Sequence, residues 1–435
     1  MIKKIAKNKL AKNIFSLGIV QIANYAIPVI AIPIVSRIIG PEKFGVINFT
    51  TAFVAYFTLL IGYGFNLTAT RRLAADPNNT EKRNVVFSEV LFTQGILLIA
   101  SIIIFIGCLY FIPQLRDEWL VSVFSFIVCF STFLTQDWLF QAMQDLSKVA
   151  LLNVISKTLF IVLIIVVVKQ RSDYIWYAFA LSISQLFVSV LSFAWSVHRY
   201  KLKFLKVRLK ACLSLLYEER MYFFSVVVIN LYTTTNIVLL GFLTNASDVG
   251  FYTAGQKISA IIIAIVNLPI RQALFPYMSK SFAIDKEKSF LVAQKFSSLV
   301  FWFCLIVAIT TFGLSKFIII YLYGESFRPA ITVLQILSVI PMIISVNNIW
   351  GVSLMMNLKL DNIYFRITVI SAISSIILNL ILVQFMGYIG SAVSWLITEF
   401  LTLASIFYFL TKTDVKLINV SYFNPFKLLN AIIKD

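Results

Sequence analysis

Charged residues are scarce in this chain of 435 residues: only 13% are Asp, Glu, Lys or Arg, whereas 60% are hydrophobic. Soluble globular proteins carry about 25% charged and about 45–50% apolar residues. The mean hydropathy of +0.90 points the same way. The composition therefore excludes an ordinary soluble domain and predicts an integral membrane protein.

Histidine and cysteine are too few and too scattered to form a metal or catalytic cluster. The single histidine, His198, stands beside a basic run, and the four cysteines contain no C-x-x-C pair. Three of these cysteines lie in apolar runs, which is typical of small buried residues. We expect no metal site, no catalytic residue and, without a Walker A motif, no ATP hydrolysis.

Twelve apolar segments are long enough to cross a bilayer, which takes about 20 helical residues. They cover residues 13–39, 44–67, 86–112, 119–141, 149–168, 174–198, 218–243, 251–278, 292–323, 329–356, 363–386 and 389–411. We therefore predict an all-α polytopic membrane protein. The ninth segment is too long for one straight helix, and we expect it to break near Gly313.

A basic run, RYKLKFLKVRLK at Arg199–Lys210, divides these segments into two sets of six. The predicted organisation is an N-terminal six-helix lobe (1–198), a cytoplasmic basic connector (199–217), a C-terminal six-helix lobe (218–411) and a cytoplasmic or interfacial tail (412–435). Anionic headgroups attract such a run at the membrane surface. We therefore expect membrane lipids as its partner, and no nucleic acid.

The orientation follows from where the basic residues lie. Most of the 37 Lys and Arg residues occupy loops that share a side with the N-terminus. The opposite loops hold only Lys43, Arg116, Lys169, Arg171 and Arg328. Because basic residues accumulate on the cytoplasmic side, both termini are predicted to be cytoplasmic.

Short matches between the halves indicate a repeat. Tyr174-Ile175 returns as Tyr388-Ile389, and Asn153 and Lys157 correspond to Asn362 and Arg366 at equivalent positions. Two halves that enter the membrane with the same orientation form a parallel repeat, related by an axis along the membrane normal. Two equivalent bundles of this kind are the usual build of a transporter with alternating access.

Two stretches carry a family resemblance: IPIVSRIIGPEKFGVINF at Ile32–Phe49 and LYGESFRPAITVLQILSVIP at Leu322–Pro341. With the twelve-span layout, the chain resembles the oligosaccharide (O-antigen and capsule) repeat-unit flippases of the multidrug/oligosaccharidyl-lipid/polysaccharide exporter superfamily. This resemblance implies transfer of a polyprenyl-diphosphate-linked oligosaccharide from the cytoplasmic to the outer leaflet of a bacterial cytoplasmic membrane. It also implies a central cavity lined mainly by spans 1, 2, 7 and 8, and work alongside polysaccharide polymerase and chain-length machinery.

Charges within the spans are functional candidates, because each costs about 2.5–3.5 kcal/mol at the bilayer centre. Seven are basic and three acidic: Arg37, Lys157, Lys257, Arg271, Lys295, Lys316 and Arg366 against Glu89, Asp137 and Glu399. The basic excess suits an anionic substrate such as a diphosphate better than a cationic drug.

Five of the basic residues are predicted to bind substrate. Arg271, after Pro269, and Lys257 share the eighth span and can form a ladder of positive charge along one path. Lys157 and Arg366 are repeat-equivalent and can receive phosphate on the inward side or extend to the interface. Arg37 lies near the outer end of the first span, where the same two interpretations apply.

Two acidic residues have open roles. Glu399 lies deep in the twelfth span and is either a coupling site for H⁺ or Na⁺ or the structural partner of a buried basic residue. Asp137, in TQDWLFQ, is either such a coupling site or an ion-pair partner of Lys157 on the adjacent span. We expect no other cofactor.

Three other functions were weighed. A cation-coupled multidrug exporter of the same superfamily would be expected to use buried carboxylates, which the basic excess disfavours. A major-facilitator transporter should carry a Gly-…-Asp-Arg-…-Gly-Arg loop between spans two and three, where this chain has TATRRLAADPNNTEKRN. A membrane-embedded polysaccharide polymerase or ligase would need a long outer loop or clustered acids and histidines. The sequence therefore favours a flippase and not an enzyme.

Overall fold

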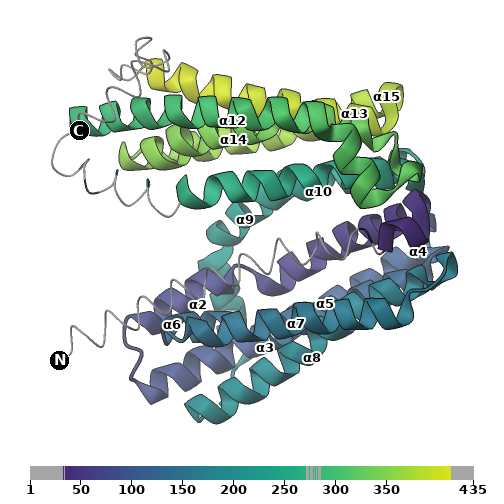
Figure 1. Cartoon of the computed structure of the whole chain (residues 1–435). Helices are drawn as coiled ribbons and strands as arrows, with labels where there is room; N and C mark the ends of the chain where they lie inside the picture. Colours follow the sequence, from purple (N-terminus) through teal and green to yellow (C-terminus); the bar gives the residue numbers. More distant parts are fainter. Residues whose placement is uncertain are drawn as a thin grey trace. The chain divides into compact units, whose positions relative to one another are not determined.

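The computed structural model describes residues 33, 35–270 and 286–412, with residues 274, 278, 280 and 282, and every regular element in this part of the chain is helical (Figure 1). Contacts divide the chain into a first unit, Met1–Val227, and a second unit, Val228–Asp435. Among the described residues, nine helices are long and apolar enough to cross a membrane. The predicted all-α membrane class is confirmed. Most of the predicted first span, 13–39, lies outside the described residues, and the number of twelve spans stays a prediction.

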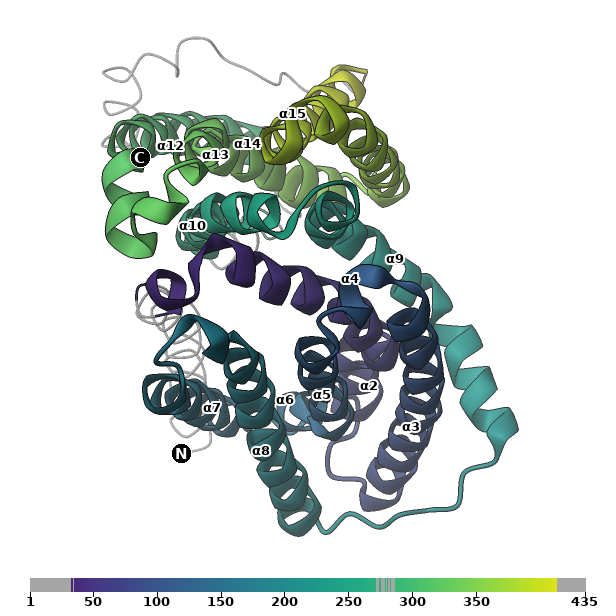
Figure 2. The same cartoon turned by 90° about the vertical axis from the view of Figure 1, so that its right-hand side faces the viewer.

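The first unit is a bundle whose helices pack side by side (Figure 2). The long helix Val35–Ala74 includes α2 (Phe65–Ala74), and α3 (Thr80–Phe111), α4 (Pro113–Arg116), α5 (Trp119–Leu134), α6 (Asp137–Ala142), α7 (Leu146–Val167), η1 (Arg171–Asp173) and α8 (Tyr174–Tyr200) follow. The side chain of Asn79 accepts a hydrogen bond from the Lys82 amide at 2.9 Å and so caps α3. α8 packs against both α5 and α7, and α6 against α2.

The second unit holds the remaining helices. α9 (Leu209–Leu243) crosses the boundary between the units, and α10 (Ala246–Pro269), α12 (Lys286–Tyr323), η3 (Glu325–Phe327), α13 (Ala330–Leu337), α14 (Ile340–Asn347), η4 (Asn348–Met355) and α15 (Asp361–Thr411) follow. α10 packs against α13, where an added Cβ on Gly255 would lie 2.7 Å from Val333. A glycine is therefore needed for this close approach.

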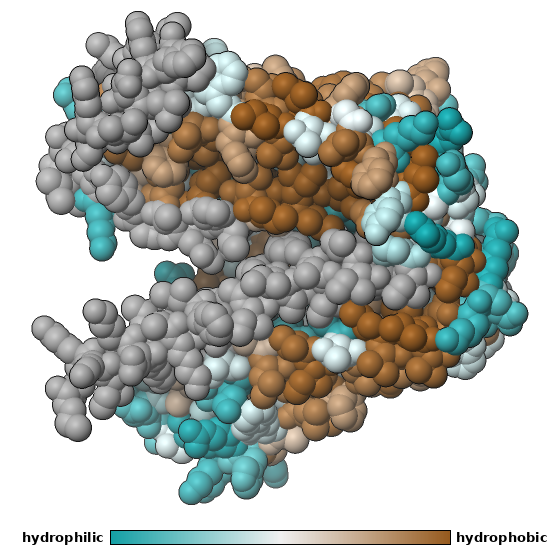
Figure 3. Space-filling view, viewed as in Figure 1, coloured by the Kyte–Doolittle hydropathy of each residue, from teal (hydrophilic) through white to brown (hydrophobic). Residues whose placement is uncertain are grey.

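In the face that Figure 3 shows, apolar side chains make up much of the described surface of both units. Ile99, Ile103 and Ile106 on α3 are each at least 60% exposed, and Ile306 and Ile309 on α12 are similarly exposed. Side chains three and four residues apart share one face of a helix. An exposed apolar stripe of this kind is what lipid contact requires.

Two glycines test the predicted span boundaries. Gly387 has φ 54° and ψ −134°, which interrupts α15 between the predicted eleventh and twelfth spans. By contrast, the predicted break near Gly313 is wrong, because α12, which is 38 residues long in all, continues through this glycine. A glycine inside a helix costs only about 1 kcal/mol relative to alanine. This cost is too small to end a long apolar helix.

η4 is a π-helix of eight residues that continues directly from α14. Its Trp350 is 2% exposed and packs with Phe407 at a ring-centroid distance of 5.7 Å. At the start of η4, the side-chain Nδ2 of Asn348 donates a hydrogen bond to the side-chain oxygen of Asn267 on α10 at 2.7 Å. π-Helical turns inside α-helices are rare.

The basic run between α8 and α9 lies along α3. Lys201, with φ 48° and ψ 49°, ends α8, and residues 202–208 have no regular secondary structure. The backbone amides of Lys203 and Leu205 donate to Asn84 at 3.0 Å and Ser88 at 2.9 Å. All six basic side chains of the run are exposed: Arg199, Lys201, Lys203, Lys206, Arg208 and Lys210.

Candidate functional site

Two membrane-spanning segments of the first unit are interrupted along their length. In Val35–Ala74, Tyr63 and Gly64 have φ values of 44° and 84°, and α2 begins immediately after them. In Trp119–Ala142, Thr135 is extended (φ −76°, ψ 122°) between α5 and α6. Discontinuous helices of this kind commonly form substrate sites in transporters.

A polar cavity of about 360 Å³ lies where these interruptions meet the neighbouring helices. Its lining comes from Val35–Ala74 and from α3 and α5 to α8, all in the first unit. The lining residues are Gly62, Asn66, Gln94, Ser131, Thr132, Thr135, Asp137, Leu152, Asn153, Ser156, Lys157, Gln185, Val188, Ser189 and Ser192. Hydroxyl and amide groups dominate this surface, which is unusual inside a membrane bundle.

The cavity lies at mid-height of the bundle. Gln94 is near the middle of α3, Lys157 near the middle of α7 and Gln185 near the middle of α8. Because a residue at the middle of a spanning helix is far from either surface, these side chains lie deep in the membrane. The sequence placed Lys157 nearer the cytoplasmic face, because it began the fifth span at residue 149 and the structure begins α7 at Leu146.

Asp137 and Lys157 both line the cavity. Asp137 is the first residue of α6, directly after the interruption, and Lys157 comes from α7. Among the described residues, no salt bridge joins the two side chains. The structure therefore brings these predicted site residues together around one cavity without closing them into an ion pair.

Three deeply buried side chains around the cavity have oxygens without a partner among the described residues. They are Gln94 Oε1, Ser131 Oγ and Ser192 Oγ, and none of these residues is more than 4% exposed. Other lining groups are satisfied; for example, Thr135 and Ser189 share a hydrogen bond of 2.9 Å. Buried polar atoms are rarely left unbonded. Gln94 is not among the predicted site residues, which are all charged, although an amide in the apolar run LFTQGILLIA is a readable signal.

Glu399 occupies a different polar centre, in the second unit. It is 3% exposed, and its two carboxylate oxygens accept hydrogen bonds from Asn347 at 3.0 Å and from the Trp395 indole at 3.2 Å. Nearby, Asn379 donates to Asn236 at 2.9 Å and to Ser394 at 2.8 Å, and accepts from Ser391 at 2.7 Å. The side chain of Asn379 is thus bonded within the cluster, whereas Oδ1 of Asn347 has no partner among the described residues.

The other predicted site residues are placed as follows. Arg37 is exposed near the start of the long helix Val35–Ala74. Lys257 is half-buried on α10, and Arg366 is exposed near the start of α15. Arg271 lies outside the described residues, so its predicted ladder with Lys257 stays a prediction.

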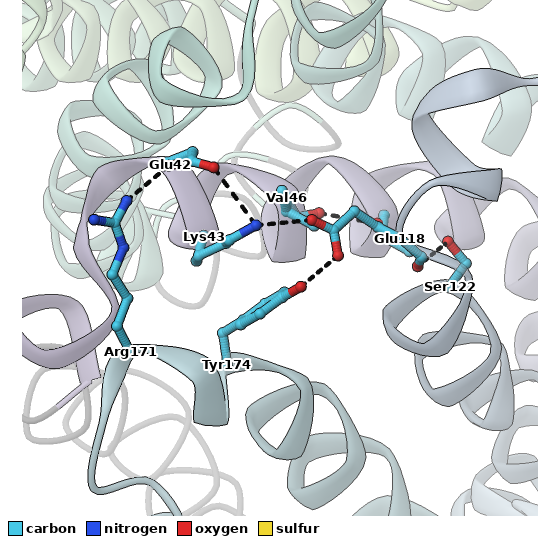
Figure 4. A network of polar contacts seen from close by, with 8 residues as sticks. Glu42, Lys43, Val46, Glu118, Ser122, Arg171 and Tyr174 are labelled. Atoms are coloured by element: carbon cyan, nitrogen blue, oxygen red, sulfur yellow. Dashed lines mark hydrogen bonds and ion pairs between the residues drawn. The ribbon is translucent and has the colours of Figure 1, made fainter.

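A polar network fastens one end of the first unit (Figure 4). Glu118, just before α5, accepts hydrogen bonds from Lys43 at 2.9 Å and from the Tyr174 hydroxyl at 2.5 Å. Arg171 donates to Glu42 at 2.7 Å. These contacts join Val35–Ala74, η1, α8 and the start of α5. Val35–Ala74, α5 and α8 also contribute to the lining of the cavity.

Solved structures with the same arrangement of helices define the class of protein. The lipid II flippase MurJ in an inward closed conformation aligns with a TM-score of 0.74 at 14% identity, covering 97% of this chain and 90% of MurJ. An inward-facing multidrug resistance MATE family transporter of the MOP superfamily aligns at 0.70 and 16% identity, covering 92% and 99%. The chain thus shares the fold of these two membrane proteins.

The family follows from the sequence comparisons. The model of the polysaccharide biosynthesis protein family matches residues 10–282. A putative O-antigen transporter of Escherichia coli (strain K12) is 27% identical over 368 residues, 83% of this chain and 87% of the relative. The chain belongs to the polysaccharide biosynthesis protein family, and the resemblance to oligosaccharide flippases is confirmed.

Proposed function

We propose that this protein moves polyprenyl-diphosphate-linked oligosaccharide repeat units from the cytoplasmic to the outer leaflet of a bacterial cytoplasmic membrane, for O-antigen, capsule or exopolysaccharide synthesis. One observation carries the proposal: the similarity to a putative O-antigen transporter runs over most of both chains. The fold alone supports flippases and multidrug transporters equally.

The proposed transport cycle is alternating access between two six-helix lobes. In this proposal twelve helices form lobes 1–198 and 218–411 as a parallel repeat, joined by the connector 199–217, and both termini and the tail 412–435 are cytoplasmic. The protein acts as a transporter and not as an enzyme. It delivers its product to the polymerase and chain-length machinery at the outer face.

Basic side chains are proposed to receive the diphosphate. Arg37, Lys157, Lys257, Arg271 and Arg366 supply positive charge within or at the ends of the spans. Arginine offers two parallel N–H donors to a phosphate, and lysine a compact point charge. A charged headgroup crossing the membrane needs such partners, because an unpaired charge at the bilayer centre costs several kcal/mol.

Asp137 and Glu399 are proposed as sites where an H⁺ or Na⁺ gradient couples to transport. Both are carboxylates within membrane-spanning segments. Asp137 borders a cavity, which suits ion exchange, whereas Glu399 is held by Asn347 and Trp395, which suits a structural role or a slowly exchanging site.

The test is genetic and biochemical. In a strain of the native host lacking this gene, surface polysaccharide and the leaflet location of the polyprenyl-linked oligosaccharide are measured together. Lost polymer with repeat units accumulating on the cytoplasmic side supports the proposal. Unchanged polysaccharide with altered drug sensitivity contradicts it and favours the multidrug exporter.

Complementation of the deletion strain with variants then tests whether the position of a cation matters, or only the total positive charge. Lys257→Gln and Arg271→Gln should restore little polymer, because each removes a cation proposed to contact the diphosphate. Lys206→Gln removes an equal charge from the exposed run between α8 and α9 and should complement fully. Equal complementation by all three variants would contradict the assignment of these cations.

A further inference from the structure

The cavity in the first unit has the surface chemistry of a sugar site. Among the described residues that line it, Asp137 and Lys157 are the charged ones, Leu152 and Val188 are the apolar side chains, and the others are polar and uncharged or glycine. Drug-sized apolar ligands need mainly hydrophobic and aromatic walls, and a diphosphate needs several cations. Sugar hydroxyls both donate and accept, as do the serine, threonine and amide groups present.

We propose that this cavity binds one sugar unit of the transported glycan and so recognises the repeat unit. The inference rests on the proposed function and adds a recognition site to it. The resemblance to known flippases implied a cavity lined by spans 1, 2, 7 and 8. The sugar cavity, in contrast, is built from helices of the first unit alone.

The size of the cavity fits a ring-sized ligand. Its volume of about 360 Å³ lies at the lower end of the range for small-molecule sites, about 300–1,000 Å³. A single ordered water needs far less room, about 10–15 Å³ by a comparable measure. The cavity is thus larger than a hydration site and smaller than a site for a whole lipid-linked oligosaccharide.

Three residues of the cavity lining have buried side-chain oxygens without a partner among the described residues. Gln94 Oε1 comes from α3, Ser131 Oγ from α5 and Ser192 Oγ from α8, so three different helices present hydrogen-bonding atoms without a partner among the described residues. Bonding these atoms to ligand hydroxyls removes a desolvation penalty. The Asp137 carboxylate accepts from ligand hydroxyls. Lys157, proposed above to receive the diphosphate, belongs to the same lining, next to which the sugar linked to that diphosphate would lie.

The interrupted helices make room for the ring. Gly62, just before the turn at Tyr63 and Gly64, lines the cavity, and an added Cβ there would meet no atom within 4 Å. Thr135, at the second interruption, also lines the cavity. Non-helical backbone at membrane depth is tolerated only where protein or a water-filled cavity surrounds it, and here both interruptions border this one polar space.

The experiment uses the full-length protein in proteoliposomes and nanodiscs. Two cavity variants, Gln94→Leu and Ser131→Ala, are compared with Ser101→Ala and Ser182→Ala. The two control serines lie on α3 and α8, are at most 1% exposed and have unpartnered oxygens, but they do not line the cavity. They therefore match Ser131→Ala in burial and chemistry.

Two quantities are measured. One is the rate of flipping of the host's lipid-linked repeat unit as a function of its concentration. The other is saturation-transfer NMR between the protein and the free oligosaccharide released from the carrier by mild acid. Loss of one hydrogen bond should weaken binding about three- to tenfold in each cavity variant, with the control variants like the wild type.

The outcomes are separable. No flipping by the wild type overturns the proposed function. In a second outcome, the wild type flips its substrate while the cavity variants and the control variants have the same half-saturating concentration and the same saturation transfer. This result overturns the sugar site and leaves a cavity that holds water only. Loss of saturation transfer in the cavity variants alone supports the site.

Discussion

The two units each bury a polar centre, and the two centres are built in opposite ways. In the first unit, Gln94, Ser131 and Ser192 surround a cavity with oxygens unpartnered among the described residues. In the second, Asn379 is fully buried and bonded to Asn236, Ser391 and Ser394. The same residue types therefore hold helices together in one unit and leave bonding capacity for a ligand in the other. Side-chain chemistry alone does not separate these roles; hydrogen-bond closure does.

The largest expected loss of stability comes from a change in the closed centre, by which we mean the hydrogen-bonded cluster of Asn379 with Asn236, Ser391 and Ser394 in the second unit. Asn379→Leu should lower the free energy of unfolding by about 3 kcal/mol, because a buried polar group left unpaired costs about 1–3 kcal/mol and this change affects several groups. Thermal unfolding of the purified protein in detergent measures the loss. An unfolding midpoint equal to that of the wild type would show that the cluster is not a stabilising element.

A second change acts on the closed centre through the backbone. Gly390→Ala would place a Cβ 2.3 Å from the carbonyl oxygen of Leu382, so the backbone that positions Ser391 must shift. We expect a destabilisation of about 2 kcal/mol, within the usual cost of overpacking. Gly313→Ala is the control, since nothing lies within 4 Å of its added Cβ, and it should be neutral or slightly stabilising. Equal effects of the two variants would be inconsistent with close packing at the kink.

A smaller loss of stability is expected from the polar network around Glu118. This network joins helices that line the open centre, by which we mean the cavity with Gln94, Ser131 and Ser192 in the first unit. Glu118→Gln weakens the contacts with Lys43 and Tyr174 and should cost about 1 kcal/mol, because this ion pair is only partly shielded from solvent. Unfolding measured at low and high salt provides the check, and the difference between variant and wild type should shrink as salt rises. A salt-independent difference would point to packing instead of charge.

The smallest stability effect should come from the open centre itself. Gln94→Leu should change the free energy of unfolding by less than about 0.5 kcal/mol, because it exchanges an amide whose oxygen has no partner for an apolar group of similar size. Compared with Asn379→Leu in the same assay, it tests the contrast directly. A loss as large as that of Asn379→Leu would mean that the two centres are alike.

Much of the fold can be predicted from the sequence because lipid imposes a strong and simple rule. Long apolar segments predicted the membrane helices, and Gly387 separates two of them where the sequence placed the boundary. Asp137 and Lys157 lie on adjacent spans and line one cavity, but the ion pair that the sequence offered is not formed among the described residues. The break at Gly313 was wrong, because a glycine inside a long apolar helix weakens it without ending it.

The candidate site was harder to predict because its key groups are neutral. Gln94, Ser131 and Ser192 cost less to bury than a charge does, so a search for charges passes over them. The interruptions at Tyr63–Gly64 and Thr135–Gln136 contain no proline and carry only a weak signal. They depend on packing between distant segments, such as the 3.0 Å hydrogen bond from Thr70 to the Trp138 carbonyl that joins α2 to α6.

The π-helix Asn348–Met355 bears on how this chain varies among its relatives. Its i→i+5 bonds take up more residues per turn than the i→i+4 bonds of the α-helix. A related chain that lacks a residue in this stretch can be α-helical throughout and still direct the side chains before and after it to the same sides of the helix. A deletion within α14 would instead rotate all later residues of that helix about its axis. Differences in length between homologues are therefore expected to concentrate in this stretch, although it lies inside a membrane span and not in a loop.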